Sequence, residues 1–525
     1  MAPVPSPFHG IEWGSTLFDP MARARWTLEP DIRAIKQTIQ SLQPLNSVEV
    51  AFLCEGGYNK VYDVKLDKKD LIMRIALPVD PYNKTLSEVA TMNWIRRTTN
   101  IPIPVPLAYD ASNNNTIGFS WILMTKMPGK RLGDFWESLS LSQMINLTQE
   151  LAQHVACLFQ NQLRGIGSIT ERRIGAEGIG SAEMMQTPPQ LVTAKETIPD
   201  ENSGPDEHIT LATGGSLLYH KGRMPLARAL VSPTISTVPI QILEEANHNP
   251  KITTEGAAIG LSGTPAHIPT VKTMLDVGQI VSPVFFWGSN IQRRIYRGPF
   301  HSSHDWLKAR LELNEHSCVS TLENASKSNL PELERYGIAL AAEGLVLTNK
   351  LKSLLPHVFP LPDPNIDSEP SVLVHEDLST WNMLLSDDGE LSAILDWEMI
   401  AALPLWKACD YPYFLQGPSR NDEPNIADYS LDENGEIESL YWQDMWEHRR
   451  TLLRSAFLHE MEELAPEWVE IHARSEAQRD FDIAVSKCAI GHYGGFINEW
   501  IEGFTGEGFS LGLKEMRDAA GMESY

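Results

Sequence analysis

The first quarter of the chain alternates between helical and strand-like spacing of its apolar residues. Residues 31–43 repeat apolar positions every three or four residues, which predicts a helix, and residues 85–97 do the same. Shorter alternating runs predict four strands, at residues 48–54, 60–66, 71–77 and 116–127. One sheet with few helices is therefore expected up to about Met127.

Beyond Pro128-Gly129 the spacing becomes mostly helical. Five helices are predicted, at residues 140–163, 303–320, 331–354, 437–464 and 474–500. Three short apolar runs interrupt them and predict strands, at residues 371–374, 383–385 and 391–395. Asp388-Gly389 is a hairpin turn signal between the last two. The order predicts an α+β fold, with a small antiparallel sheet lobe before a large, mostly helical lobe.

One internal segment differs from the rest in composition. Residues 171–272 contain no Phe or Trp and a single tyrosine, Tyr219, without sustained periodicity. This composition favours an insertion that is largely disordered. Either a genuine insertion or a retained intron would account for the segment. The predicted division is a lead-in with one helix (1–44), a nucleotide-binding small lobe (45–127), a helical lobe (128–170 and 273–525) and the insertion (171–272).

Composition narrows the class of protein. The 525 residues are 42% hydrophobic and 21% charged, as in globular proteins, and the net charge is −25. A strongly acidic chain is a poor candidate for binding nucleic acid, which needs clustered Lys and Arg. Five scattered cysteines without a CxxC motif, no secretory signal and no long apolar run predict a cytoplasmic protein that does not bind membranes.

The small lobe carries candidate phosphate-binding residues. Gly56 and Gly57 lie in the turn between the first two predicted strands, where backbone N–H groups could approach phosphate oxygens. Arg74 lies within an apolar strand and needs a partner, for which Glu88 is the natural candidate. Glu88 could instead complete a capping box with Thr85, and both interpretations stay open.

The connector between the lobes is a candidate for binding a nucleotide base. Residues 124–127 read MTKM and end just before Pro128-Gly129. The backbone groups of an extended connector, at Thr125 and Met127, could pair with the edge of a purine. An ordinary linker would have the same sequence.

Three polar residues of the second half form an ordered set at the ends of predicted strands. Asp377 and Asn382 lie in the loop between two strands, and Asp396 directly follows a third. Phosphoryl transfer needs a base beside the acceptor hydroxyl and oxygen ligands for Mg²⁺. Asp377 is therefore the candidate base, and Asn382 and Asp396 are candidate metal ligands. Turn-capping roles would explain each residue singly, but not the set.

Several motifs in this order resemble the aminoglycoside phosphotransferase-like family, particularly its fungal members, over about residues 45–165 and 275–500. The motifs are EGGYNKVYDVKL, IMRIALPVDP, SEVATMNWI, WILMTKMPG, HEDLSTWN and ILDWE. The resemblance implies a protein-kinase-like fold, ATP or GTP as phosphoryl donor and a hydroxyl as acceptor. Arg74 replaces the strand lysine that is usual in this family, which is a departure.

Two functions compete on these features. The first is a Mg²⁺-dependent phosphotransferase acting on a small molecule, since a protein kinase would carry a long activation segment after Asp396. The second is a pseudokinase, a nucleotide-binding or empty interaction module that has the fold but no turnover, which Arg74 favours. A cationic acceptor could meet acidic or aromatic side chains in the segment after Asp396, of which the candidates are Trp442, Asp444, Trp446, Glu447 and Glu460.

Overall fold

The computed structural model describes most of the chain outside the predicted insertion. The described residues are 6–16, 19–42, 47–66, 69–173, 208–212, 216–221, 241–242, 273–325, 332–363, 365, 367–431, 435–489, 493–505, 512–514 and 516. The predicted disorder of residues 171–272 therefore concerns a segment that lies largely outside the described residues.

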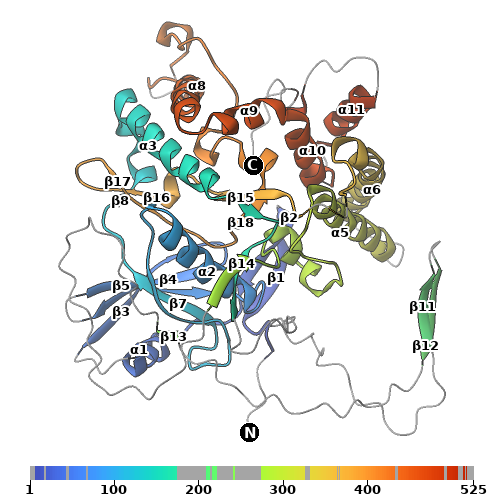
Figure 1. Ribbon diagram of the computed structural model, residues 1–525, viewed down its shortest axis with the longest axis horizontal. Coiled ribbons are helices and arrows are strands. Elements are labelled where there is room, and N and C mark those ends of the chain that lie inside the picture. The colour runs from blue at the N-terminus through green and yellow to red at the C-terminus, as the bar shows by residue number, and fades with distance from the viewer. Residues whose placement is uncertain are drawn as a thin grey trace.

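An antiparallel six-stranded sheet forms the small lobe (Figure 1). Its strands, in spatial order, are β13 (Gln241–Ile242), β6 (Pro106–Asp110), β7 (Ser120–Thr125), β5 (Lys69–Ala76), β4 (Asn59–Leu66) and β3 (Val48–Glu55). Alternate residues of β7 face opposite ways: Leu123 packs in a cluster with Ile35 of α1 (Ile32–Leu42), and Ile122 packs in a cluster with Val89 of α2 (Asn83–Thr98). The sheet thus lies between two helices.

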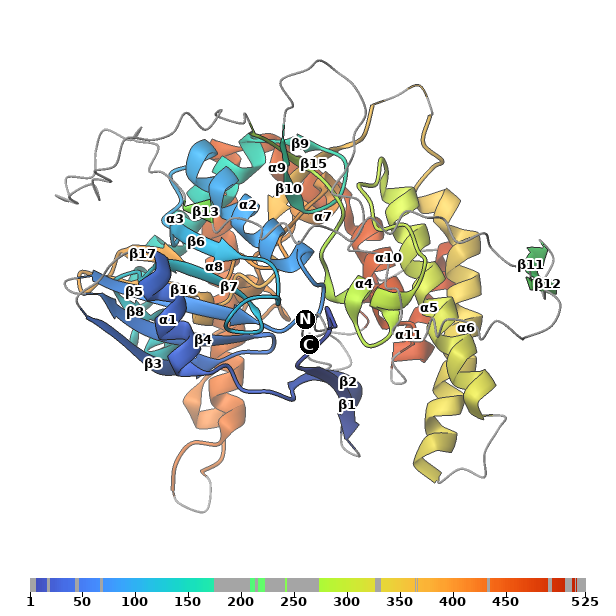
Figure 2. The same cartoon turned by 90° about the horizontal axis from the view of Figure 1, so that it is seen from below.

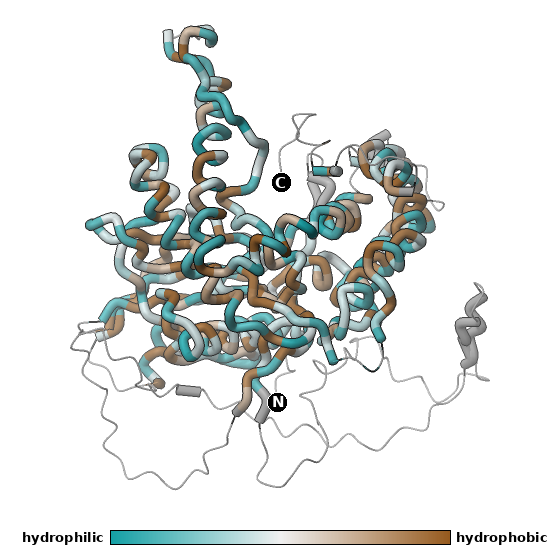
Figure 3. Tube along the Cα trace, turned by 45° about the horizontal axis from the view of Figure 1, so that its top comes forward, coloured by the Kyte–Doolittle hydropathy of each residue, from teal (hydrophilic) through white to brown (hydrophobic). Residues whose placement is uncertain are grey.

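The large lobe is built mainly from helices, which in both Figure 1 and Figure 2 extend away from the sheet. They are α3 (Leu141–Gln160), α4 (Pro283–Phe286), α5 (Ser303–Ala325), α6 (Glu332–Val358), α7 (Leu405–Ala408), α8 (Ser439–Leu464), α9 (Pro466–Arg474), α10 (Glu476–Lys487) and α11 (Gly494–Thr505). Hydrophobic segments gather where helices and strands pack, and hydrophilic ones lie outward (Figure 3).

Two small antiparallel sheets lie in the large lobe. One consists of β8 (Lys130–Arg131), β16 (Met383–Leu385) and β17 (Leu391–Ile394). The other consists of β9 (Leu163–Arg164), β15 (Pro370–Val374) and β18 (Ala401–Pro404). Buried Met383, Leu385 and Val372 join the main hydrophobic cluster, so the loops at the strand ends are held on a rigid base.

The structure adds one element and corrects one prediction near the chain ends. The lead-in contains an unpredicted antiparallel hairpin of β1 (Ile11–Thr16) and β2 (Asp19–Trp26), whose Trp13 contacts Trp287. The helix predicted over 474–500 is instead two helices, α10 and α11, of which α11 begins at paired glycines, Gly494 and Gly495. Glycine weakens a helix interior, and this signal could have located the break.

The predicted insertion is flanked by two paired strands. In β10 (Ile169–Arg173) and β14 (Thr273–Val277), Arg173 lies opposite Thr273. Within the interval, β11 (His208–Ala212) pairs with β12 (Ser216–Lys221), and β13 joins the edge of the main sheet beside β6. The chain therefore leaves and re-enters the fold at adjacent positions.

Taken together, these elements confirm the predicted α+β, protein-kinase-like fold with a small sheet lobe and a large helical lobe. None of the helices that the structure describes has both the length and the apolar character needed to span a bilayer.

Candidate active site

Asp377 and Asn382 are joined within the loop that connects β15 to β16. The Asn382 side-chain amide donates 2.9 Å hydrogen bonds to the Asp377 carboxylate and to the Asp377 carbonyl oxygen. Buried His375 anchors this loop, because its Nε2 lies 2.8 Å from the Leu395 carbonyl oxygen. The Asp377 carboxylate is exposed and oriented, as a base that receives a proton from an acceptor must be.

Asp396 lies beside this loop at the end of β17. The Leu395 N–H donates a 2.8 Å hydrogen bond to the Asn382 carbonyl oxygen, which brings the two candidate metal ligands together. Asp396 has a φ of +62°, in the left-handed region that non-glycine residues rarely adopt. Backbone strain of this kind is concentrated at functional sites.

Arg74 connects the small lobe to this site. Its guanidinium lies 2.9 Å from Glu88, 2.6 Å from Asp396 and 2.8 Å from Glu398. The predicted pairing with Glu88 is therefore confirmed, and the capping box is wrong: Thr85 donates to Ser120, and α2 begins without a side-chain cap. Arg74 is buried, so leaving its charge without a partner would be costly, and Glu88 supplies that partner.

Three further residues complete this buried cluster and were not predicted as site residues. Lys84 lies 2.5 Å from Glu398, and the Asn59 amide donates to Glu398 over 2.9 Å. Lys84 also donates to the Asn59 side-chain oxygen over 2.9 Å. No spacing in the sequence links Asn59, Lys84 and Glu398. Lys84 has only 2% of its side chain exposed and therefore needs a partner, but this burial is visible only in the structure.

The cluster contains one more negative than positive group. Two cations, Arg74 and Lys84, face three carboxylates, Glu88, Asp396 and Glu398. Burial raises the pKa of Glu88 to about 7, although Arg74 and Lys84 oppose this shift. Burial acts the same way on Glu398, but Arg74 and Lys84 outweigh it and lower its pKa to about 2. With a pKa of about 7, Glu88 is partly protonated at neutral pH, so Asp396 and Glu398 carry most of the negative charge that faces Arg74 and Lys84.

Burial also affects the two titratable groups of the loop. It raises the pKa of Asp377, opposed by His375 and by the hydrogen bond from Asn382. It lowers the pKa of His375, which keeps that imidazole neutral in its structural position. Asp377 is thereby a stronger base than an ordinary aspartate once it is deprotonated.

The glycine turn connects β3 to β4 above the charged cluster. A Cβ atom added at Gly56 or Gly57 would have no neighbour within 4 Å, and neither residue has a positive φ. The fold itself therefore does not require glycine at either position. Asn59, two residues further, bonds Glu398 and so holds the turn toward the site. Close approach of a ligand to the backbone would explain the glycines.

Thr125 and Met127 of the connector differ in the hydrogen bonds that they already make. The Thr125 N–H already donates to the Val105 carbonyl oxygen over 3.0 Å. Met127 lies beyond β7 and is half-buried, and its sulfur accepts a weak hydrogen bond from the Thr125 hydroxyl. Gly129 follows with a φ of +110°, and a Cβ there would lie 2.5 Å from the Leu385 carbonyl oxygen, so the connector packs closely on β16.

The oxygen atoms of Asn382 and Asp396 fit a magnesium ion. Asn382 uses its amide nitrogen for Asp377, which leaves Oδ1 as its remaining donor atom toward a cation. Asp396 offers the second carboxylate oxygen, since Oδ1 accepts from Arg74. No group of three or more His, Cys, Asp or Glu side chains that could hold a metal ion occurs among the described residues.

Aromatic side chains occur in the Asp377–Asn382 loop and on α8. Trp381 is 56% exposed, and its ring packs over Gly133, where a Cβ would lie 2.7 Å from a ring carbon. Trp446 of α8 stacks on Trp136 at 6.3 Å. Two of the acidic candidates on α8 already have partners: Asp444 accepts a hydrogen bond from Tyr429 and pairs with Arg420, and Glu460 accepts from Gln153. Trp442 is exposed. The Glu447 carbonyl oxygen accepts a hydrogen bond from the Thr451 hydroxyl, one turn later.

Sequence comparisons identify relatives of limited coverage. A subtelomeric hrmA-associated cluster protein of Aspergillus fumigatus is 30% identical over 128 residues, which are 24% of this chain and 25% of that protein. The altered inheritance of mitochondria protein 9 of Candida dubliniensis is 32% identical over 95 residues, 17% of this chain and 15% of that protein. The matched stretch thus spans about a quarter or less of each relative.

Solved structures of similar topology are distant in sequence. Aminoglycoside phosphotransferase APH(4)-Ia, in a ternary complex with ADP and hygromycin B, matches with a TM-score of 0.36 and 12% identity, over 90% of this chain and 99% of that chain. Spectinomycin phosphotransferase APH(9)-Ia, in complex with ADP and spectinomycin, matches with a TM-score of 0.31 and 9% identity, over 89% and 100%.

The family comparison covers both lobes. The model of the phosphotransferase enzyme family matches residues 49–162 and 298–406, with the predicted insertion lying between the two stretches. The matched ranges contain the glycine turn, Arg74, Glu88, Asp377, Asn382 and Asp396. Over these two stretches the chain is similar to the phosphotransferase enzyme family.

Proposed function

We propose that this protein transfers the γ-phosphoryl group of ATP or GTP to a hydroxyl group of a small molecule, with Mg²⁺ as cofactor. The observation that carries the proposal is the direct contact of Arg74, from the small lobe, with Asp396, which adjoins the Asp377–Asn382 loop. One triphosphate lying between the lobes could then be reached by the glycine turn and by these side chains.

Each residue has a role in this proposal. The backbone at Gly56 and Gly57 cradles phosphate oxygens, and Arg74, held by Glu88, presents positive charge to the phosphates. Contact of Arg74 with a phosphate requires it to release Asp396 or Glu398, which it holds here. The Met127 backbone is the better candidate of the connector for the base, because the Thr125 N–H is already bonded.

Asp377 acts on the acceptor. Its exposed carboxylate accepts the proton of the attacking hydroxyl, while Asn382 fixes its orientation. Asn382 and Asp396 would hold Mg²⁺, which when bound neutralises phosphate charge. Exposed Trp381, four residues after Asp377, is the proposed acceptor contact.

The test uses purified protein, Mg·ATP or Mg·GTP and a pool of cellular metabolites. Release of nucleoside diphosphate and the appearance of one phosphorylated metabolite are expected. Asp377→Ala should lower the rate by about 100-fold or more, which is the scale of losing a general base. The same variant should still bind nucleotide, measured as a rise in melting temperature.

A pseudokinase is the second candidate, favoured by the three carboxylates that engage Arg74. It predicts that nucleotide raises the melting temperature of the native chain while neither the native chain nor Asp377→Ala turns it over. No thermal shift and no turnover would contradict the phosphotransferase and the nucleotide-binding form of the pseudokinase.

A further inference from the structure

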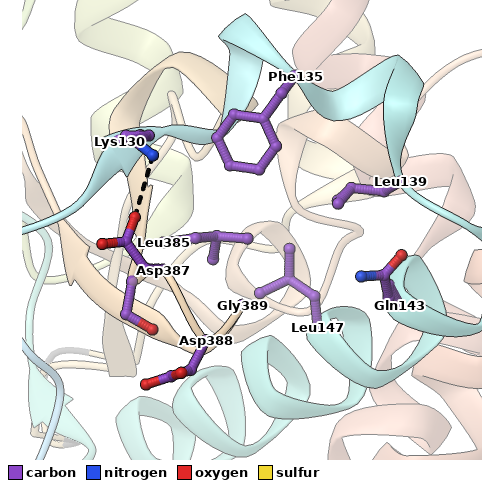
Figure 4. Close-up of a pocket in the computed structure, with 10 residues that line it drawn as sticks. Lys130, Phe135, Leu139, Gln143, Leu147, Leu385, Asp387, Asp388 and Gly389 are labelled. Atoms are coloured by element: carbon purple, nitrogen blue, oxygen red, sulfur yellow. Dashed lines mark hydrogen bonds and ion pairs between the residues drawn. The ribbon is translucent and has the colours of Figure 1, made fainter.

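A cavity of about 400 Å³ lies in the large lobe, away from the charged cluster (Figure 4). It is enclosed by three parts of the chain: the segment from β8 to Leu139, the first turns of α3, and the turn of the β16–β17 hairpin. Its volume is within the range of small-molecule sites.

This cavity is separate from the proposed nucleotide site. Asp377, Asn382 and Asp396 are not among the residues that line the cavity. Asn382 directly precedes β16 and bonds Asp377, whereas Leu385, at the end of β16, lines the cavity. The length of β16 therefore lies between Asn382 and the cavity lining.

The interior of the cavity is apolar. In Figure 4 the side chains of Phe135, Leu147 and Leu385 point toward one another across it, with Leu139 beside them. Leu147 and Leu385 are buried, whereas Phe135 and Leu139 are partly exposed members of the same cluster. A ligand with a compact hydrocarbon body would cover this surface.

The rim of the cavity is acidic on one side. Asp387 and Asp388 of the hairpin turn lie together there, and Glu390 follows them in the chain. Lys130 is the cation among the lining residues and pairs with Asp387 at 3.0 Å, with both side chains largely exposed. Such a pair is weak and exchanges readily. An incoming cation could take the place of Lys130 at Asp387 and would also lie near Asp388.

We propose that this cavity is a second binding site, for a small organic cation with an apolar body and one ammonium group. The apolar body fills the space between Phe135, Leu147 and Leu385, and the ammonium group pairs with Asp387 and Asp388. The site functions without the catalytic residues, so it does not depend on the proposed phosphotransferase activity.

Titration calorimetry on the full chain tests this with three probes of one shape: 1-aminoadamantane, 1-adamantanol and 1-adamantanecarboxylate. Saturable binding is expected for the amine, with the alcohol weaker by about threefold or more and the carboxylate weaker still. Equal affinity for amine and alcohol, or no saturable binding of the amine up to its solubility limit, would overturn the proposal.

Variants locate the binding. Asp387→Asn and Asp388→Asn should each weaken amine binding by about two- to fivefold, the scale of one exposed charge pair. Asp422→Asn removes an equally exposed carboxylate elsewhere and should have no effect. Leu147→Ala should weaken all probes that bind. If Asp422→Asn weakens binding as much as the rim variants do, the attraction is non-specific and the proposal fails.

A last arm distinguishes this site from the nucleotide site. Saturating Mg·ATP should leave amine affinity unchanged, and Asp396→Asn should also bind the amine normally. Displacement of the amine by nucleotide would mean that it occupies the cleft between the lobes, which would overturn the separate site. Amine binding without any kinase turnover would overturn only the proposed function.

Discussion

Arg74 and Asp396 are 322 positions apart in the chain and are joined by a 2.6 Å hydrogen bond between the two lobes. This bond links β5 of the small lobe to the end of the hairpin that carries Asn382. The phosphate-binding and metal-binding candidates therefore meet at one point, and a change at Arg74 should be felt in both stability and catalysis.

Replacing Arg74 should destabilise the protein strongly. Arg74→Ala leaves Glu88 buried without its guanidinium partner, and such losses cost about 3–5 kcal/mol of unfolding free energy. Lys130→Ala, which breaks the exposed pair with Asp387, should cost less than about 1 kcal/mol. Urea denaturation measures both.

A double variant separates charge from packing in this cluster. Adding Glu88→Gln to Arg74→Ala removes the unpaired charge. The double variant should therefore lose less unfolding free energy than the two single variants lose in sum. Additive effects, or an Arg74→Ala cost no greater than that of Lys130→Ala, would show that the buried ion pair is unimportant for the fold.

Trp381 should determine affinity for the acceptor. It lies four residues after Asp377 in the same loop and its ring is exposed, and Trp442 is similarly exposed on α8. Once an acceptor is known, Trp381→Ala should raise its KM by about three- to tenfold, the scale of one aromatic contact, with the nucleotide KM unchanged. Trp442→Ala is the matched control. A raised acceptor KM in that variant alone would place the acceptor over α8 instead.

Asp80 should make stability depend on pH. It is 1% exposed, and burial raises its pKa from 3.8 to about 6, although the hydrogen bond from Asn83 and the charge of Arg297 oppose this. Between these values the folded chain keeps a proton that the unfolded chain loses, so the contribution of Asp80 to stability falls as pH rises. The full change is about 3 kcal/mol.

Asp80→Asn removes this titration. The unfolding free energy of the variant relative to the native chain should therefore rise between about pH 4 and pH 6 and stay level above, measured by denaturation at each pH. Asp422→Asn, exposed elsewhere, should show no such change. A difference between variant and native chain that does not vary with pH would contradict the raised pKa.

The flanking strands of the predicted insertion should fold without it. Because Arg173 lies opposite Thr273, replacing residues 174–272 by an Asn-Gly turn would leave an antiparallel hairpin. The melting temperature should change by less than about 4 °C, even though the pairing of β13 with β6 is lost. A version that also lacks Thr273 shifts the register by one residue and should be less stable. Equal stability of the two would contradict this pairing.

Much of the small lobe could be predicted from the sequence, because β4, β5 and α2 have clear periodicity and turn signals. The pairing of Arg74 with Glu88 followed from the cost of burying a lone charge. The partners Lys84, Asn59 and Glu398 could not be predicted, because only tertiary packing brings them together. The N-terminal hairpin was missed because its stability comes from contacts such as Trp13 with Trp287, far away in the chain.

Asn382, which bonds Asp377, directly precedes β16, and Leu385, which lines the cavity, ends that strand. Inserting or deleting a single residue within β16 would shift its pairing with β17 and turn its buried apolar side chains toward the opposite face. Length variation among homologues should therefore be confined to residues 386–390, the turn that joins the strands, and be absent from the strands themselves.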